Sequence, residues 1–215
     1  MNLTYYYDVC SMWCAMGDEV LVAINKRYGS RVPIVRKIAL INDGEPMAAG
    51  LEQEKWYYDR CDFVTGRRFN HNWIEKSGQT TWAPNAVIQA AESLGYGNAV
   101  REILKTEGLM EGRPILRLEV ALELAAKASG ISQSELQHAV NDEKTANTIK
   151  TNTVEFGLLP ANQRPTFLLR SNIEDTVLLS GIYRPEPVFA AIEAMISDED
   201  AYERFRASYP PIPEQ

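Results

Sequence analysis

"NLTYYYDVCSMWCAMGDEVL", residues 2 to 21, predicts the first two elements of the chain. The first half is rich in Thr and Tyr and reaches Asp8, which is typical of a buried strand that runs into a tight turn. From Ser11 onward the apolar residues recur at steps of three or four, the period of an amphipathic helix. Gly29 supplies the expected end of this helix. We therefore expect a strand that leads directly into a helix.

A second strand is predicted in "RVPIVRKIAL", residues 31 to 40. It should lie parallel to the first strand, because a helix between two strands of one sheet forms a right-handed crossover. Residues 1–41 are therefore expected to form a βαβ unit.

Residues 42–160 contain no convincing strand and are predicted to form a helical block. Pro84 suits the first turn of one helix, and Ser132 with Glu135 has the spacing of a capping box at the start of another. The predicted helices are 51–64, 83–95, 98–108, 113–130, 132–140 and 144–157. The block separates the N-terminal unit from the next predicted strands.

Residues 161–215 change pattern again. "RPTFLLR" (164–170) and "DTVLLSG" (175–181) are two short β-type runs joined by a polar turn, which favours an antiparallel hairpin. A helix is predicted over 186–196, and the proline-rich tail 209–215 is expected on the surface. The βαβ and ββα units can share one mixed sheet with helices on both faces.

Composition excludes several function classes. The chain has 215 residues and a net charge of −7 with both signs mixed throughout, so no cationic face is expected for nucleic acid. The N-terminus lacks the pattern of a secretory signal, and no apolar run is long enough to span a membrane, so a cytoplasmic protein is expected. Three cysteines are too few for a disulfide scaffold, and neither histidine has a partner at metal-ligand spacing.

The order of elements and four short motifs resemble a known superfamily. "YDV" before the first helix, "SMWC" at its start, "RPTF" at the third strand and "LLSGIY" before the last helix lie at both ends of the chain. Together they resemble the DsbA superfamily, including its 2-hydroxychromene-2-carboxylate isomerases and kappa-class glutathione transferases. The resemblance implies an α/β fold: a thioredoxin-like fold with a large all-helical insertion between the βαβ and ββα halves.

The resemblance assigns roles to the first helix. Disulfide oxidoreductases of the superfamily carry Asp-x-x-Cys-Pro-Trp-Cys, and counting from Asp8 places Ser11 at the first cysteine and Cys14 at the second. Trp13 precedes Cys14 as the pattern expects, and Cys10 lies one residue outside the register. The nucleophilic cysteine is thus replaced by serine.

Serine at this position has two interpretations. In the resembling transferases and isomerases it donates a hydrogen bond to the sulfur of glutathione, whereas serine is also among the best residues for capping a helix. Cys14 is expected inside the first turn, facing the sheet, where a buried thiol is at least as often inert as reactive. A disulfide between Cys10 and Cys14 requires their Cα atoms to lie within about 7 Å of each other. A functional Cys10–Cys14 pair is therefore a separate hypothesis.

The third strand and the last helix supply the remaining candidates for binding. The resemblance implies a cis peptide bond before Pro165, a cleft beside Arg164 and Thr166, and a turn that includes Gly181 and Arg184. Arg164 would bind a carboxylate or point into solvent. The glutathione-binding relatives have Gly-x-Asp-Arg at this turn, but Tyr183 replaces the aspartate here.

Three functions follow from these residues. The first is a DsbA-type oxidoreductase that acts on thiols or disulfides through Cys14, with or without Cys10 in place of the missing nucleophile. The second is a glutathione-dependent isomerase or transferase centred on Ser11. The third is a redox-inactive protein that binds a peptide or small molecule. No metal or permanently bound cofactor is expected, glutathione is the candidate ligand, and the resemblance leaves a homodimer open.

Overall fold

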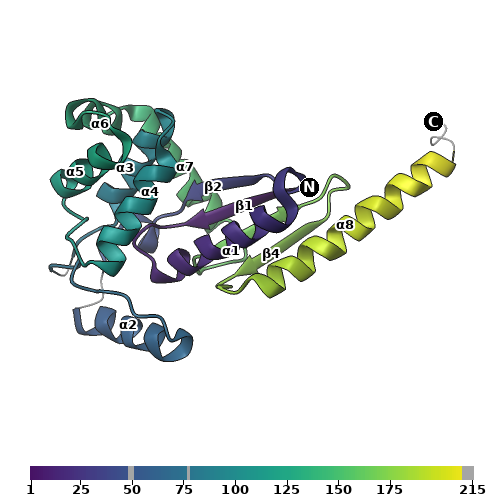
Figure 1. Ribbon diagram of the computed structural model, residues 1–215, viewed down its shortest axis with the longest axis horizontal. Coiled ribbons are helices and arrows are strands. Elements are labelled where there is room, and N and C mark those ends of the chain that lie inside the picture. Colours follow the sequence, from purple (N-terminus) through teal and green to yellow (C-terminus); the bar gives the residue numbers. More distant parts are fainter. Residues whose placement is uncertain (48–50, 77, 210–215) are drawn as a thin grey trace.

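A four-stranded mixed sheet forms the centre of the computed structural model, which describes residues 1–47, 51–76 and 78–209 (Figure 1). The strand order is β2-β1-β3-β4. The first strand lies parallel to the second and antiparallel to the third, which pairs antiparallel with the fourth. The strands are β1 (Asn2–Tyr7), β2 (Ile34–Ile38), β3 (Thr166–Arg170) and β4 (Thr176–Ser180). The predicted mixed sheet is confirmed.

Helices surround this sheet and form a separate block at one end of it (Figure 1). The helix α1 (Met12–Tyr28) connects β1 to β2, and α8 (Pro185–Ser208) follows β4 and extends well past the sheet. The inserted helices are α2 (Leu51–Thr65), α3 (Trp82–Ser93), α4 (Gly97–Lys105), α5 (Leu118–Ser129), α6 (Gln133–Val140) and α7 (Glu143–Gly157). Figure 1 shows α2 set apart from the other five. The predicted thioredoxin-like arrangement with a helical insertion is confirmed.

The consecutive tyrosines of β1 explain how the sheet is held between two layers. Successive side chains of a strand point to opposite faces. Tyr5 packs with Tyr7 and Phe167 in the main core, which includes the buried side of α1. Tyr6 faces the other way and packs against Phe156 of α7 in a second, smaller cluster. Both faces of β1 are therefore buried.

Two predicted helix boundaries are wrong. The helix expected over 113–130 begins only at Leu118, because the chain makes tight turns around Pro114 and Arg117 has the extended backbone of an N-cap residue. The helix expected over 186–196 continues to Ser208, since no glycine or proline interrupts residues 188–209. The expected surface tail falls largely on residues 210–215, outside the described residues.

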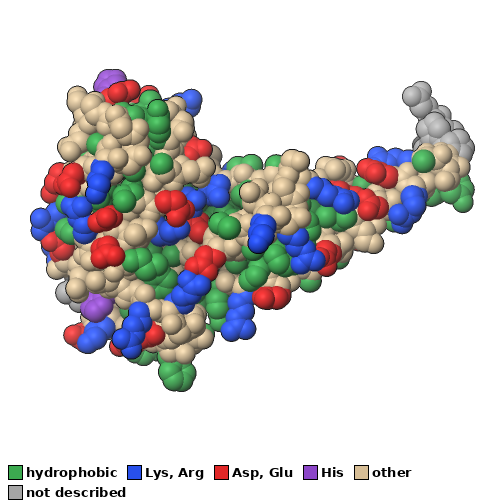
Figure 2. Space-filling view, in the orientation of Figure 1, with side chains coloured by type: hydrophobic (Ala, Val, Ile, Leu, Met, Phe, Trp, Pro, Cys, Tyr) green, Lys and Arg blue, Asp and Glu red, His purple; other side chains and the backbone are tan. Residues whose placement is uncertain are grey.

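The surface carries charges of both signs. On the face shown in Figure 2, acidic and basic side chains alternate over the body and along the projecting part of α8. Within residues 1–47, 51–76 and 78–209, no helix has the length and apolar character needed to cross a membrane. In the same ranges, no three His, Cys, Asp or Glu side chains gather closely enough to hold a metal ion.

Candidate functional site

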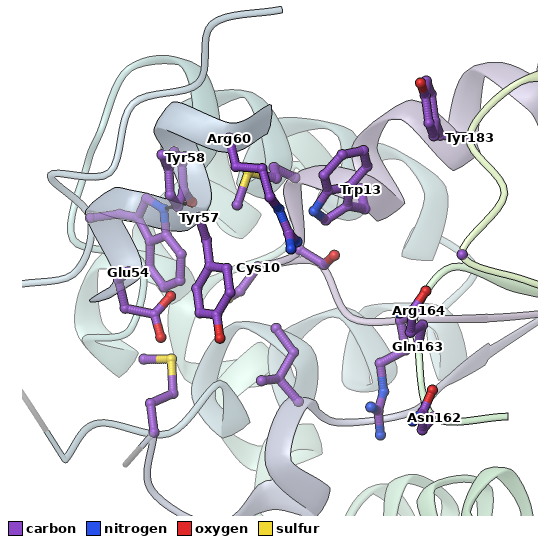
Figure 3. A pocket seen from close by; sticks show the side chains of 16 residues that line it. Cys10, Trp13, Glu54, Tyr57, Tyr58, Arg60, Asn162, Gln163, Arg164 and Tyr183 are labelled. Carbon is purple, nitrogen blue, oxygen red and sulfur yellow. Dashed lines mark hydrogen bonds between the residues drawn. The ribbon is translucent and has the colours of Figure 1, made fainter. Parts of the chain in front are cut away.

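A cavity of about 520 Å³ opens at the N-terminus of α1 (Figure 3). Its walls come from the β1–α1 turn, from α2, from the segment before β3 and from the segment after β4. The residues that line it are Cys10, Ser11, Met12, Trp13, Ile41, Met47, Glu54, Tyr57, Tyr58, Arg60, Trp73, Asn162, Gln163, Arg164, Gly181 and Tyr183. Segments far apart in the sequence thus meet at Ser11.

Ser11 is the N-cap of α1, as predicted. Its backbone is extended (φ −88°, ψ 117°), and its Oγ accepts a hydrogen bond from the Cys14 N–H at 3.3 Å. Within the described residues, the N–H groups of Met12 and Trp13 have no acceptor. The side chain of Ser11 is partly exposed to the cavity. The cavity therefore ends at unpaired N–H groups and at the positive end of the helix dipole.

Asp8 fixes the turn that carries Ser11. Its carboxylate is fully buried and accepts hydrogen bonds from the N–H groups of Cys10 (2.9 Å) and Ile41 (2.8 Å). The Thr81 hydroxyl (2.5 Å) and the Asn85 amide (2.8 Å) donate to the same carboxylate. Four donors from three parts of the chain satisfy the buried charge. The N-terminus of α1 is consequently held in one orientation.

The cysteines are poorly placed for nucleophilic chemistry. Cys10 and Cys14 are free and only 3% and 2% exposed, so the structure contains no bond between them. Burial raises the pKa of the Cys14 thiol to about 12, and burial next to the Asp8 carboxylate raises the pKa of Cys10 well above its usual value. Cys10 lines the cavity, whereas Cys14 is not among the lining residues. Both thiols are therefore protonated near neutral pH.

The cis peptide bond expected before Pro165 is present. Pro165 packs against α1 where that helix has Gly17, because a Cβ atom at Gly17 would lie 2.9 Å from the Pro165 Cβ. The Pro165 carbonyl accepts a hydrogen bond from the Gly181 N–H at 2.8 Å. Gly181, with a φ of 71°, lines the cavity on the same side. The start of β3 is thus joined to the first helix and to the end of β4.

Arg164 lines the cavity but is already engaged. Its Nε donates to the Ala39 carbonyl at 2.7 Å, its guanidinium lies 4.3 Å from the Phe156 ring centroid, and its Nη2 contacts Asp43 at 3.3 Å. The side chain is only 11% exposed. The alternative in which Arg164 points into solvent is therefore wrong, and the carboxylate it meets in this structure belongs to the chain itself.

Two other expected binding residues lie outside the cavity wall. Thr166 is fully buried, and its hydroxyl donates to the Gln163 carbonyl at 2.6 Å, at the start of β3. Arg184 is the N-cap residue of α8, and its guanidinium packs over the neighbouring Tyr183 ring at 5.4 Å. Neither is among the lining residues. Thr166 and Arg184 therefore contact neighbouring residues of the chain and do not face the cavity.

The helix α2 supplies a wall that the sequence did not reveal. Arg60 lies over the rings of Trp13, Trp56 and Tyr57 at 5.8, 5.2 and 5.3 Å from their centroids. Figure 3 shows the Arg60 side chain running beside Trp13, with Glu54 on the other side of the Tyr57 ring. The aromatic run "WYYDR" (56–60) was the available signal.

Two aromatic contacts hold the walls of the cavity in place. Tyr58 accepts a hydrogen bond from the Trp73 indole at 2.6 Å, which ties α2 to the loop that follows it. Trp13 packs against Tyr183 with ring centroids 5.4 Å apart, which joins α1 to the segment after β4. Aromatic side chains from α1, α2, the loop after α2 and the segment after β4 therefore contribute to the cavity wall.

Comparison with known proteins relates this arrangement to solved structures. Neither a protein-family model nor a curated protein sequence matches the chain. The cytosolic disulfide reductase DsbM from Pseudomonas aeruginosa, solved with GSH, matches with a TM-score of 0.68 and 21% identity over 92% of this chain and 100% of that one. The chain has the DsbA-like thioredoxin fold.

Two further structures share this DsbA-like fold. A 2-hydroxychromene-2-carboxylate isomerase matches with a TM-score of 0.60 and 16% identity over 94% of this chain and 98% of that chain. DsbA from Pseudomonas aeruginosa matches with a TM-score of 0.60 and 12% identity over 94% of this chain and 85% of that chain. Proteins described as a disulfide reductase, an isomerase and DsbA thus share the fold of this chain.

Proposed function

We propose that the chain binds a small-molecule thiol, with glutathione as the candidate, and uses it in an isomerase or transferase reaction. The observation that carries this proposal is Ser11, which caps α1 and lines the cavity while both neighbouring cysteines are buried. The sulfur of the ligand would lie at the N-terminus of α1, where a thiol nucleophile lies in dithiol oxidoreductases of this fold.

The chemistry of a serine N-cap supports this arrangement. The Ser11 oxygen accepts the Cys14 N–H, so its own proton is available to a ligand in the cavity. A hydroxyl that donates to a thiolate, together with the N–H groups of Met12 and Trp13, favours the anion over the neutral thiol. Each charge-assisted hydrogen bond of this kind contributes about 1.5–3 kcal/mol. The helix would therefore activate an external thiol.

Thiol–disulfide exchange through Cys14 has less support from the geometry. Burial raises the pKa of the Cys14 thiol to about 12, so very little of it would be a thiolate at pH 7. Cys14 also lies outside the cavity wall, and Cys10 is buried beside the Asp8 carboxylate. The attacking species in exchange is the thiolate. An oxidoreductase function through Cys14 would require its thiol to become accessible.

Calorimetry with glutathione and S-methylglutathione tests the proposed function. The wild type should bind glutathione more tightly than the S-methyl form, because only the free thiol becomes an anion that the helix stabilises. Cys14→Ser should bind glutathione as the wild type does. Absence of binding to either compound would refute the proposal, and loss of a model-disulfide reductase activity in Cys14→Ser would support the oxidoreductase alternative. Thiol binding without turnover of any tested electrophile would favour the redox-inactive binding protein.

A further inference from the structure

The helix α2 contributes one acidic and one basic side chain to the cavity, and these two charges indicate which class of thiol the cavity fits. Three charged side chains line it: Glu54, Arg60 and Arg164. Arg164 is occupied by the Ala39 carbonyl and by Asp43. Among the described residues, Glu54 has no cationic partner, and Arg60 contacts aromatic rings and has no carboxylate partner. One negative and one positive group thus remain available to a ligand.

Their positions on α2 separate them along the cavity. Glu54 and Arg60 are six residues apart in one helix, which corresponds to about 9 Å along the helix axis. Figure 3 shows them on either side of the Tyr57 ring, with Arg60 towards Trp13. An ammonium and a carboxylate on the same α-carbon are much closer together than this. The ligand groups that match Glu54 and Arg60 therefore belong to opposite ends of a molecule several bonds long.

The turn before α8 contributes no carboxylate to the cavity, so a ligand ammonium would depend on Glu54. Tyr183 and Arg184 occupy this turn, and Arg184 is a cation that packs over the Tyr183 ring. None of the residues that line the cavity from this turn is acidic. Glu54 is the only carboxylate among the described residues of the wall, and burial raises its pKa, as expected for a carboxylate that lacks a cationic partner. A ligand ammonium would supply that partner.

We propose that the cavity selects a dipolar peptide thiol, with the ligand's ammonium bound by Glu54 and a carboxylate at its far end bound by Arg60. This inference rests on the proposed thiol site at Ser11, which would hold the sulfur of the same ligand. Trp13 and Tyr57 hold the Arg60 guanidinium in place through cation–π contacts, which leaves its N–H donors free for a planar carboxylate.

Paired changes of ligand and protein test the assignment by calorimetry. Glutathione should bind Glu54→Gln about tenfold more weakly than the wild type, because a charge-assisted contact at a half-buried carboxyl is lost. Arg60→Gln should weaken binding about threefold to fivefold, because this exposed guanidinium is screened by solvent. Glu52→Gln and Lys55→Gln change charges on the same helix outside the cavity wall, so they should bind glutathione as the wild type does.

Modified ligands identify which charge meets which residue. N-acetylglutathione lacks the ammonium, so it should bind the wild type weakly and be insensitive to Glu54→Gln. The glycine ethyl ester of glutathione should be insensitive to Arg60→Gln. The assignment would be overturned if Glu54→Gln and Arg60→Gln weakened the binding of both modified ligands equally, or if neither variant weakened the binding of either ligand. Both outcomes would leave thiol binding at Ser11 intact. The N-acetyl comparison on the wild type decides the ammonium contact even if a variant fails to fold.

Discussion

Replacing Ser11 with cysteine places a protein thiol at the position where we propose that a ligand sulfur binds. The new side chain would sit at the N-cap, partly exposed, beside the unpaired N–H groups of Met12 and Trp13. A charge-assisted hydrogen bond contributes about 1.5–3 kcal/mol, which corresponds to about 1.1–2.2 pKa units. Starting from an ordinary cysteine pKa of about 8.5, the introduced thiol should titrate between about 6.3 and 7.4.

The rate of alkylation by iodoacetamide as a function of pH measures this pKa. The wild-type background should be low, because Cys10, Cys14 and Cys61 are all buried. Ser132→Cys is the matched control, since Ser132 caps α6 by accepting the Glu135 N–H but lies outside the cavity wall. A pKa in Ser11→Cys at or above 8.5 would refute the reasoning, because the N-terminus of α1 would then give no stabilisation to a thiolate.

Three further substitutions test the framework around the site by chemical denaturation. Gly17→Ala should destabilise the fold by about 1–3 kcal/mol, because its Cβ would lie 2.6 Å from the Tyr5 Oη, and an unchanged stability would contradict that close packing. Asp8→Asn should cost about 3–5 kcal/mol, because an amide cannot accept from four donors, and a loss below 1 kcal/mol would show that the turn tolerates unpaired donors. Asp18→Asn should cost about 3 kcal/mol, because it leaves the buried Arg101 guanidinium without its buried carboxylate partner, and a neutral result would rule out that dependence.

The elements near the sheet could be predicted because their signals are local. The run of tyrosines, the serine at the start of α1 and the capping pair Ser132–Glu135 each determine backbone conformation within a few residues. The cis bond before Pro165 was expected from the resemblance to a fold whose third strand starts there. Periodicity and capping are therefore reliable where neighbouring residues determine the outcome.

The cavity wall could not be predicted in the same way. Whether Glu54 and Arg60 face Ser11 depends on how α2 packs across the N-terminus of α1, and no short sequence motif encodes that packing. Arg164 shows the same difficulty, because its partners Ala39 and Asp43 lie more than 120 residues earlier in the chain. Thr166 was assigned to the cleft by its neighbour Pro165, although β3 is buried on both faces and the Thr166 side chain is buried with it.

Ser11 has two proposed roles, as the cap of α1 and as a hydrogen-bond donor to the sulfur of a bound ligand. The two roles predict different effects of Ser11→Ala. A cap contributes about 1 kcal/mol to stability whether or not a ligand binds. Ser11→Ala and Ser132→Ala remove equivalent caps, since each serine accepts the N–H three residues later at 3.3 and 3.2 Å. Similar losses of stability in both variants are expected, so stability alone does not distinguish the two roles.

The thiol pKa of bound glutathione does distinguish them. It can be measured by ultraviolet titration of the thiolate in complexes with the wild type, Ser11→Ala and Ser132→Ala. We predict that Ser11→Ala raises the bound thiol pKa by about one to two units, corresponding to a lost charge-assisted hydrogen bond of about 1.5–3 kcal/mol, while Ser132→Ala leaves it unchanged. The same bound thiol pKa in all three complexes would contradict the account, because Ser11 would then be a helix cap and no more.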